Sequence, residues 1–193
     1  MTNTHLGLLR HGQTDWNIDL RLQGTTDIPM NETGILQIEQ AAQVLANHQW
    51  DLILTSPLGR AVQSAEIVQR RLENVQLEVE PLLLERSFGE GEGLTYPQWQ
   101  AKYSDLEHIP GAESKLEVEA RSRALLDHFV KNYAGARILA VSHGALIRCI
   151  ISEVSQGTVP PKGERLQNAS LHRLEHRGGW KLEGWAPQPL AEI

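Results

Sequence analysis

The sequence predicts an α/β fold: a three-layer α/β/α sandwich around a mostly parallel sheet with an antiparallel edge. Short apolar runs alternate with helix-like segments along the 193 residues, a pattern typical of a parallel sheet covered on both faces. Near the C-terminus, two alternating segments flank Gly178-Gly179, which predicts a hairpin at the sheet edge. The length suits one core, so we expect a single domain over 1–193.

The N-terminal half contains two strand–helix pairs. The apolar run Leu6–Leu9 predicts a buried strand, and Asn31 is a suitable N-cap for the helix that follows. Leu52–Thr55 predicts a second strand, after which Ser56-Pro57 supplies an N-cap and a first-turn proline. The apolar positions at helical spacing are Ile35, Ile38, Ala42 and Leu45 in the first helix, and Leu58, Ala61, Ala65, Val68 and Leu72 in the second.

The C-terminal half continues the alternation. Leu77–Val79 predicts a third strand and Ile138–Ser142 a fourth. A capping-box pattern at Ser114 starts a helix that runs to about Lys131, and another helix runs from Gly144 to about Glu153. Segment 86–113 breaks the pattern, because it is rich in glycine, proline and aromatic residues; we expect it to form an irregular lid insertion over one end of the sheet.

Composition excludes several classes of protein. The net charge of −6 argues against binding to nucleic acid or to an anionic membrane. The apolar runs are shorter than the ~20 residues of a membrane span, and the N-terminus lacks a secretory-signal pattern. The single cysteine, Cys149, cannot form an internal disulfide, and we expect it to be a buried apolar residue. These features predict a cytoplasmic protein, with a homodimer possible.

Two of the predicted strands end in a histidine followed by glycine. Arg10 and His11 follow the first strand, and His143 follows the fourth. Ligands of such sheets bind at the carboxyl ends of the strands, so both histidines are expected to face one crevice. The glycines, Gly12 and Gly144, allow sharp turns and close approach to a ligand.

An arginine near a helix start indicates the charge of the ligand. Arg60 falls in the first turn of its predicted helix, where the helix dipole disfavours a cation by ~0.3–1 kcal/mol. A bound anion between Arg60, the helix N-terminus and Arg10 would explain this placement. Two guanidinium groups and two imidazoles suit a tetrahedral dianion such as a phosphoryl group.

The same residues suggest a reaction. Neighbouring arginines lower a histidine's pKa from ~6.5, which favours a neutral nitrogen able to attack phosphorus while the other histidine donates to a phosphoryl oxygen. A carboxyl group is then needed to protonate the leaving group, and spacing alone leaves four candidates. No HExxH or CxxC pattern predicts a metal site, and no cofactor is expected. The candidate acids are Glu85, Glu90, Glu92 and Glu113.

Six segments, in order, match one known family. RHGQTDWN resembles the RHGxTxxN signature of the histidine phosphatase superfamily, in its phosphoglycerate mutase-like branch. RLQGTTDIPMNETG, TSPLGRAVQSAEI, LLERSFGEGEGL, PGAES and VSHGALIR are similar to the family's later motifs. The match covers nearly the whole chain and is most like the family's short phosphatases, such as α-ribazole phosphatases or broad-specificity phosphatases.

The resemblance implies roles for particular residues. His11 would be phosphorylated transiently, and Glu85 would be the proton donor. The remaining residues implied are Arg10, Arg60 and His143 around the phosphoryl group, and Asn17, Gln23, Gly24 and Gly144 at the substrate.

Four functions remain to be compared. Cofactor-dependent mutases of this family carry a tyrosine, a lysine and an asparagine where this chain has Phe88, Tyr96 and Ala145. We therefore predict a phosphatase acting on a small phosphorylated metabolite, with the mutase as an alternative. A non-catalytic phosphate-binding or regulatory module is a second alternative, and an interaction protein acting through Trp180 and Trp185 in the tail hairpin is a third.

Overall fold

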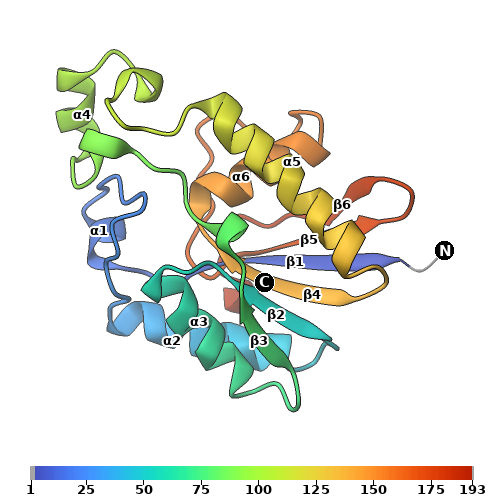
Figure 1. Cartoon of the computed structure of the whole chain (residues 1–193). Helices are drawn as coiled ribbons and strands as arrows, with labels where there is room; N and C mark the ends of the chain where they lie inside the picture. The colour runs from blue at the N-terminus through green and yellow to red at the C-terminus, as the bar shows by residue number, and fades with distance from the viewer. Residues whose placement is uncertain (1–2, 193) are drawn as a thin grey trace.

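The computed structural model describes residues 3–192 and confirms the α/β fold (Figure 1). Its sheet has six strands in the order β3-β2-β4-β1-β5-β6. β1, β2, β3 and β4 are mutually parallel where they pair, whereas β5 runs antiparallel to both β1 and β6. The strands are β1 (Thr4–Arg10), β2 (Leu52–Thr55), β3 (Gln76–Val79), β4 (Arg137–Ser142), β5 (Leu171–His176) and β6 (Trp180–Gly184).

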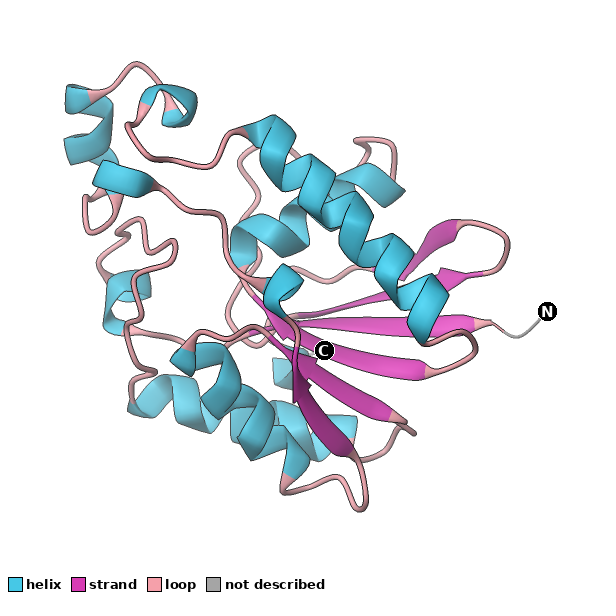
Figure 2. Cartoon of the chain, in the orientation of Figure 1, coloured by secondary structure: helices cyan, strands magenta, loops and turns pink. Residues whose placement is uncertain are grey.

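Helices cover both faces of the sheet (Figures 1 and 2). Helices α2 (Glu32–Leu45) and α3 (Gly59–Gln69) lie on one face, and α5 (Lys115–Asn132) and α6 (Gly144–Val154) on the other. Side chains alternate between the faces along a strand. Leu8 accordingly packs in the core cluster on the α5/α6 side and Leu9 in the cluster on the α2/α3 side, both with 0% exposure.

Of the three predicted N-cap residues, two are right and one is wrong. The Asn31 side chain accepts a hydrogen bond from the Gly34 N–H at 2.9 Å, and Ser114 forms its capping box at the start of α5. The prediction that Ser56 caps the next helix is wrong, because α3 begins at Gly59 and its N-cap, Leu58, makes no side-chain capping bond. The Ser56 hydroxyl bonds elsewhere, as described below.

Segment 86–113 is more regular than expected. It contains α4 (Tyr96–Lys102) and two short 3₁₀ turns, and it lies beside α1 (Asp15–Ile18), the other short helix that the sequence did not predict. Both helices lie at the carboxyl-end side of the parallel strands (Figure 1). The 3₁₀ turns of the chain are η1 (Pro81–Leu83), η2 (Gly89–Gly91), η3 (Leu106–His108) and η4 (Leu190–Glu192).

Three side chains differ from their expected exposure. Cys149 is only partly buried and packs against the α5/α6 cluster. Trp180 and Trp185 also pack against that cluster, so the hairpin does not present them as a free surface. Within residues 3–192, no helix combines the length and apolar character needed to cross a membrane.

Candidate active site

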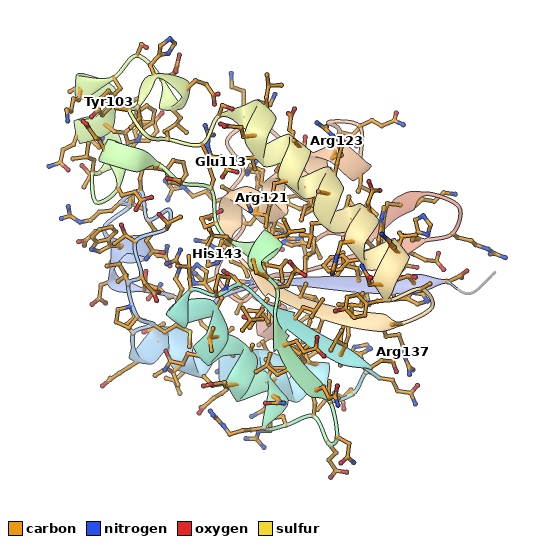
Figure 3. All side chains as sticks on the ribbon, viewed as in Figure 1. Tyr103, Glu113, Arg121, Arg123, Arg137 and His143 are labelled. Atoms are coloured by element: carbon orange, nitrogen blue, oxygen red, sulfur yellow. The ribbon has the colours of Figure 1, made fainter. Side chains whose placement is uncertain are left out.

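The pairing of β1 with β4 brings His11 and His143 together. Arg10 is the register partner of Ser142, and the His11 N–H donates to the Ser142 carbonyl at 3.0 Å. The two imidazole rings follow directly, with centroids 5.1 Å apart and planes tilted by 56°. Figure 3 shows His143 where β4 ends and α6 begins, between the two helical layers. The site therefore lies at the carboxyl ends of the two central strands.

His11 is held in one tautomer. Its side chain is buried, with 2% exposure, and Nδ1 lies 2.7 Å from the Gly12 carbonyl oxygen. Because a carbonyl can only accept, Nδ1 carries the proton and Nε2 keeps its lone pair. Burial, followed by the charges of Arg10 and Arg60, holds the His11 pKa well below 6.5. His11 thus presents a neutral, unprotonated Nε2 at neutral pH.

His143 is fully buried at the N-cap position of α6. Its Nε2 lies 2.7 Å from Ser56 Oγ, and Nδ1 has no hydrogen-bond partner within residues 3–192. Burial lowers the His143 pKa well below 6.5, and Arg60, His11 and Arg10 lower it further. The neutral ring can carry its single proton on Nδ1, with Ser56 donating to Nε2.

Two buried arginines flank the imidazoles. Arg10 donates through Nη1 to the Leu166 carbonyl, and burial lowers its pKa to about 10, so it remains cationic at neutral pH. Arg60 has 0% exposure and donates to the carbonyls of Gly24 and Thr26 at 2.7 and 2.8 Å. Burial lowers the Arg60 pKa as well.

Three buried nitrogen atoms of this group lack a hydrogen-bond partner in the described part of the chain. They are Nε of Arg10, Nε of Arg60 and Nδ1 of His143. An unpaired buried donor costs about 1–3 kcal/mol, so such groups mark a place where a ligand is expected. Two cations and converging N–H donors suit an oxyanion. The arrangement is therefore suited to a tetrahedral anion.

The carboxylate of Glu85 lies against the N-terminus of α6. Its Oε2 accepts from the Ala145 N–H at 3.1 Å, and Oε1 accepts from the N–H groups of Leu146 and Arg86 at 3.1 and 2.9 Å. The carboxylate is 8% exposed. Its negative charge partly offsets the lowering of the Arg10 and Arg60 pKa values by burial. Glu85 is therefore close enough to both cations to interact with them electrostatically.

The other three candidate carboxylates are committed elsewhere. Figure 3 shows Glu113 and Arg121 near the start of α5, where the carboxylate accepts two bonds from the guanidinium at 2.9 and 2.7 Å. Glu92 accepts the backbone N–H groups of Thr25 and Thr26, both at 2.9 Å, and exposed Glu90 lies 3.6 Å from Lys102 Nζ.

The predicted substrate-binding residues surround the same site. Asn17 Oδ1 accepts from the Thr14 N–H at 3.1 Å, and Gln23 donates through Nε2 to the Thr14 hydroxyl. Gly24 has φ +56°, and a Cβ there would lie 2.0 Å from Glu92 Oε1, so only glycine fits. A Cβ on Gly144 would lie 3.4 Å from the Arg10 guanidinium carbon.

Two residues of the site were missed from the sequence. Ser56 follows β2 directly, at the same end of the sheet as the histidines. Because ligands bind at the carboxyl ends of the strands, this position could have marked Ser56 as a site residue, as it did His11. Asn168 is buried and donates through Nδ2 to the His11 carbonyl at 2.9 Å and to Asn17 Oδ1 at 3.1 Å. It comes from a loop 157 residues further along the chain, and no local pattern marks it.

One cluster in the described residues brings three potential metal-ligand atoms close together. His5, Glu175 and Glu183 each offer a ligand atom, and these atoms lie within 4.8 Å of one another. His5 lies near the start of β1, at the opposite end of the strand from His11. The cluster therefore takes no part in the site described above.

The chain belongs to the histidine phosphatase superfamily, branch 1, whose family model matches residues 6–187. Among curated relatives, an uncharacterized phosphatase PhoE of Bacillus subtilis is 36% identical over 94% of this chain and 94% of its own length. A probable phosphoglycerate mutase GpmB of Photorhabdus laumondii is 33% identical over 96% of this chain and 92% of its own.

Solved structures show the same fold. A mycobacterial glucosyl-3-phosphoglycerate phosphatase in complex with VO3 aligns with a TM-score of 0.82 and 33% identity, covering 94% of this chain and 98% of that chain. The same phosphatase in complex with inorganic phosphate also aligns with a TM-score of 0.82, at 30% identity over 97% and 98% of the two chains.

Proposed function

We propose that this protein is a phosphatase that hydrolyses a small phosphomonoester through a phosphohistidine on His11. The observation that carries the proposal is the state of His11, whose Nδ1 donates to Gly12 O while Nε2 is left unprotonated in a buried, cationic setting. A neutral imidazole nitrogen beside two fixed guanidinium groups is suited to attack on phosphorus.

In the first step, Arg10, Arg60 and His143 bind the phosphoryl oxygens, and the unpaired Nε and Nδ1 atoms donate to them. His11 Nε2 forms a bond to phosphorus as the ester P–O bond breaks, and protonated Glu85 transfers its proton to the departing alkoxide oxygen. In the second step, Glu85 takes a proton from water, whose oxygen attacks phosphorus. The His11–phosphorus bond breaks and inorganic phosphate leaves.

The relatives support an anionic phosphoryl ligand. Vanadate stands in for a phosphoryl group, and the mycobacterial phosphatase forms complexes with VO3 and with inorganic phosphate. The relative from Bacillus subtilis is named a phosphatase. These names agree with a hydrolase that acts on a small phosphorylated metabolite.

A phosphoglycerate mutase is the second candidate, because the relative from Photorhabdus laumondii is named a probable mutase. A mutase keeps the phosphoryl group on the enzyme until a second substrate hydroxyl takes it. Such transfer needs more cationic groups around a doubly phosphorylated intermediate than segment 86–113 offers, since its Arg86 is engaged by Glu107 at 2.6 Å. We therefore favour water as the acceptor.

His11→Ala tests the proposal with p-nitrophenyl phosphate as substrate and no added metal. Wild type should hydrolyse the ester and yield acid-labile, base-stable phosphate on the protein after rapid quenching. His11→Ala should lose both signals, with a rate at least 10³-fold lower, whereas the exposed control His48→Asn should keep them. Hydrolysis by His11→Ala at the wild-type rate would refute the proposal. Interconversion of phosphoglycerates faster than hydrolysis would replace the phosphatase with the mutase.

A further inference from the structure

The buried amide of Asn168 joins two parts of the anion site. Asn168 is 8% exposed, and its Nδ2 donates to the His11 carbonyl at 2.9 Å and to Asn17 Oδ1 at 3.1 Å. An amide NH2 group carries two protons, so these two bonds use its full donor capacity. The same side chain therefore connects the backbone of the candidate nucleophile with the side chain of a predicted substrate-binding residue.

Backbone groups decide which way each of the two amides faces. The His11 carbonyl can only accept, so the NH2 group of Asn168, and not its oxygen, must lie beside it. The Thr14 N–H can only donate, and it lies 3.1 Å from Asn17 Oδ1. Asn17 Oδ1 thus accepts from both Thr14 and Asn168, which holds the Asn17 amide in one orientation.

This orientation leaves the NH2 group of Asn17 free. Both hydrogen bonds of the Asn17 side chain end on Oδ1, and within residues 3–192 its Nδ2 donates to no protein group. Turning the amide over would set its NH2 group against the Thr14 N–H and the Asn168 NH2 group, where donor would face donor. Asn17 lies in α1, six residues after His11, so its NH2 group is a fixed donor close to the candidate nucleophile in the chain.

The loop that carries Asn168 is bonded to the site through its own backbone. The Ala169 N–H donates to the Arg10 carbonyl at 3.1 Å, and the Ser170 carbonyl accepts from the Arg10 N–H at 3.0 Å. Arg10 directly precedes His11. Asn168 therefore projects from a loop whose next two residues are bonded to the residue before the candidate nucleophile, which fixes the place of its side chain.

We propose that Asn168 is a positioning residue, which orients the amide of Asn17 as a donor to the bound phosphoryl group. The inference rests on the proposed phosphatase function and adds a residue that acts through Asn17 and not on the substrate itself. A donor that is oriented before the ligand arrives loses little freedom when the ligand binds. Without Asn168, only the Thr14 N–H restrains the Asn17 amide, so part of the population presents an oxygen to the anion.

A double-mutant cycle tests this role through the binding of orthovanadate, which stands in for the phosphoryl group. Isothermal titration calorimetry gives its Kd without turnover. Asn17→Ala and Asn168→Ala should each raise Kd about tenfold, the loss expected when a hydrogen bond to a charged group is removed or disordered. The double variant should bind within about threefold of Asn17→Ala alone, because Asn168 acts through Asn17. Gln167→Ala, which changes an exposed neighbour on the same loop, is the matched control and should keep the wild-type Kd.

A second variant covers the case in which Asn168→Ala does not fold. Asn168→Leu keeps the branched shape without donors or charge, and it should raise Kd as Asn168→Ala does. Fold-changes that multiply in the double variant would mean that Asn168 and Asn17 act independently, which overturns the positioning role. A wild-type Kd in Asn168→Leu, or an equal rise in Gln167→Ala, overturns it as well. Absence of p-nitrophenyl phosphate hydrolysis by wild type would instead overturn the phosphatase function.

Discussion

At the scale of single residues, the chemistry of the site depends on which nitrogen atoms carry protons. The Gly12 carbonyl fixes the proton of His11 on Nδ1, and the Ser56 hydroxyl is the group available to fix that of His143. Both rings are buried beside arginines, which keeps them neutral. One ring thus offers a lone pair and the other a proton, although the two share a residue type and a strand-end position.

Ser56→Ala tests the positioning role of the hydroxyl. Without Ser56 Oγ at 2.7 Å, the His143 Nε2 loses its partner, and the proton can shift from Nδ1 to Nε2. We expect kcat to fall roughly 10- to 100-fold with a smaller change in KM, because the lost interaction strengthens in the transition state. Ser56→Thr keeps the hydroxyl and should recover much of kcat. Equal kcat values for Ser56→Ala and wild type would refute this role.

The sequence pointed to the two histidines of the site through local patterns and missed residues that only tertiary contacts bring there. His11 and His143 each follow an apolar strand, a pattern visible within ten residues. Asn168 supports the His11 carbonyl from the other end of the chain, through a contact that exists only once β5 pairs with β1. Spacing left the acid open among four carboxylates, and the bonds from Ala145 and Leu146 to Glu85 are also tertiary contacts. The role of Glu85 as the acid stays a prediction.

At the scale of elements, Glu92 joins two loops around the site. Its carboxylate accepts the N–H groups of Thr25 and Thr26 from one loop and that of Phe88 from segment 86–113. Burial alone would raise the Glu92 pKa, but the hydrogen bonds from Thr26, Thr25 and Phe88 hold it below its ordinary value. The carbonyl of Gly24, the residue before Thr25, accepts a hydrogen bond from Arg60. The Glu92 contacts therefore also help to hold Arg60, a candidate catalytic residue, in place.

Glu92→Gln should weaken the hydrogen bonds that join the two loops. The amide keeps one oxygen acceptor but replaces the other with a donor that faces backbone N–H groups, so we expect a loss of about 1–3 kcal/mol in the free energy of unfolding. kcat/KM for p-nitrophenyl phosphate should fall as well, because Arg60 is less well held. Urea denaturation and kinetics measure the two effects. Glu90→Gln, which changes an exposed neighbouring carboxylate, is the matched control. Equal effects of the two substitutions would contradict the role of Glu92 in joining the two loops.

The predicted elements differ from the observed ones where local signals are weak. Strong apolar periodicity and good caps located α2, α5 and α6 to within about a residue at their N-termini. The short helices α1 and α4 have few apolar positions, and α3 starts later than Ser56-Pro57 suggested because Ser56 bonds to His143 instead of capping. The action of segment 86–113 as a lid stays a prediction.

At the scale of the whole molecule, the sheet order explains why one site forms. β1 and β4 lie side by side in the centre, although 126 residues separate the end of β1 at Arg10 from the start of β4 at Arg137. β2 lies on the other side of β4, which brings Ser56 to the same edge. Ligands of α/β sheets bind at carboxyl ends of strands. Burial of so many polar groups at this edge has a cost in stability that depends on pH.

Three buried histidines set that dependence. Burial holds the pKa of His11 and His143 well below 6.5 and lowers that of His172 to about 4. Below pH 6.5 the unfolded chain binds a proton on each ring while the folded protein does not, so acid favours unfolding. The free energy of unfolding should therefore fall between pH 6.5 and 5, by up to about 1.4 kcal/mol per pH unit for each histidine.

Urea denaturation at pH 7, 6 and 5 measures this loss of stability. Carboxylates with lowered pKa values, such as Asp51 and Glu117, contribute to the pH dependence of stability mainly at lower pH. His172→Gln removes one of the three groups from a position away from the anion site, where His172 stacks on Trp185. Its slope between pH 6 and 5 should be about one third shallower than that of wild type, whatever its stability at pH 7. A wild-type stability that stays constant from pH 7 to 5 would mean that the buried rings take up protons as readily in the folded protein as in the unfolded chain. That result would also remove the basis for a neutral His11 as nucleophile.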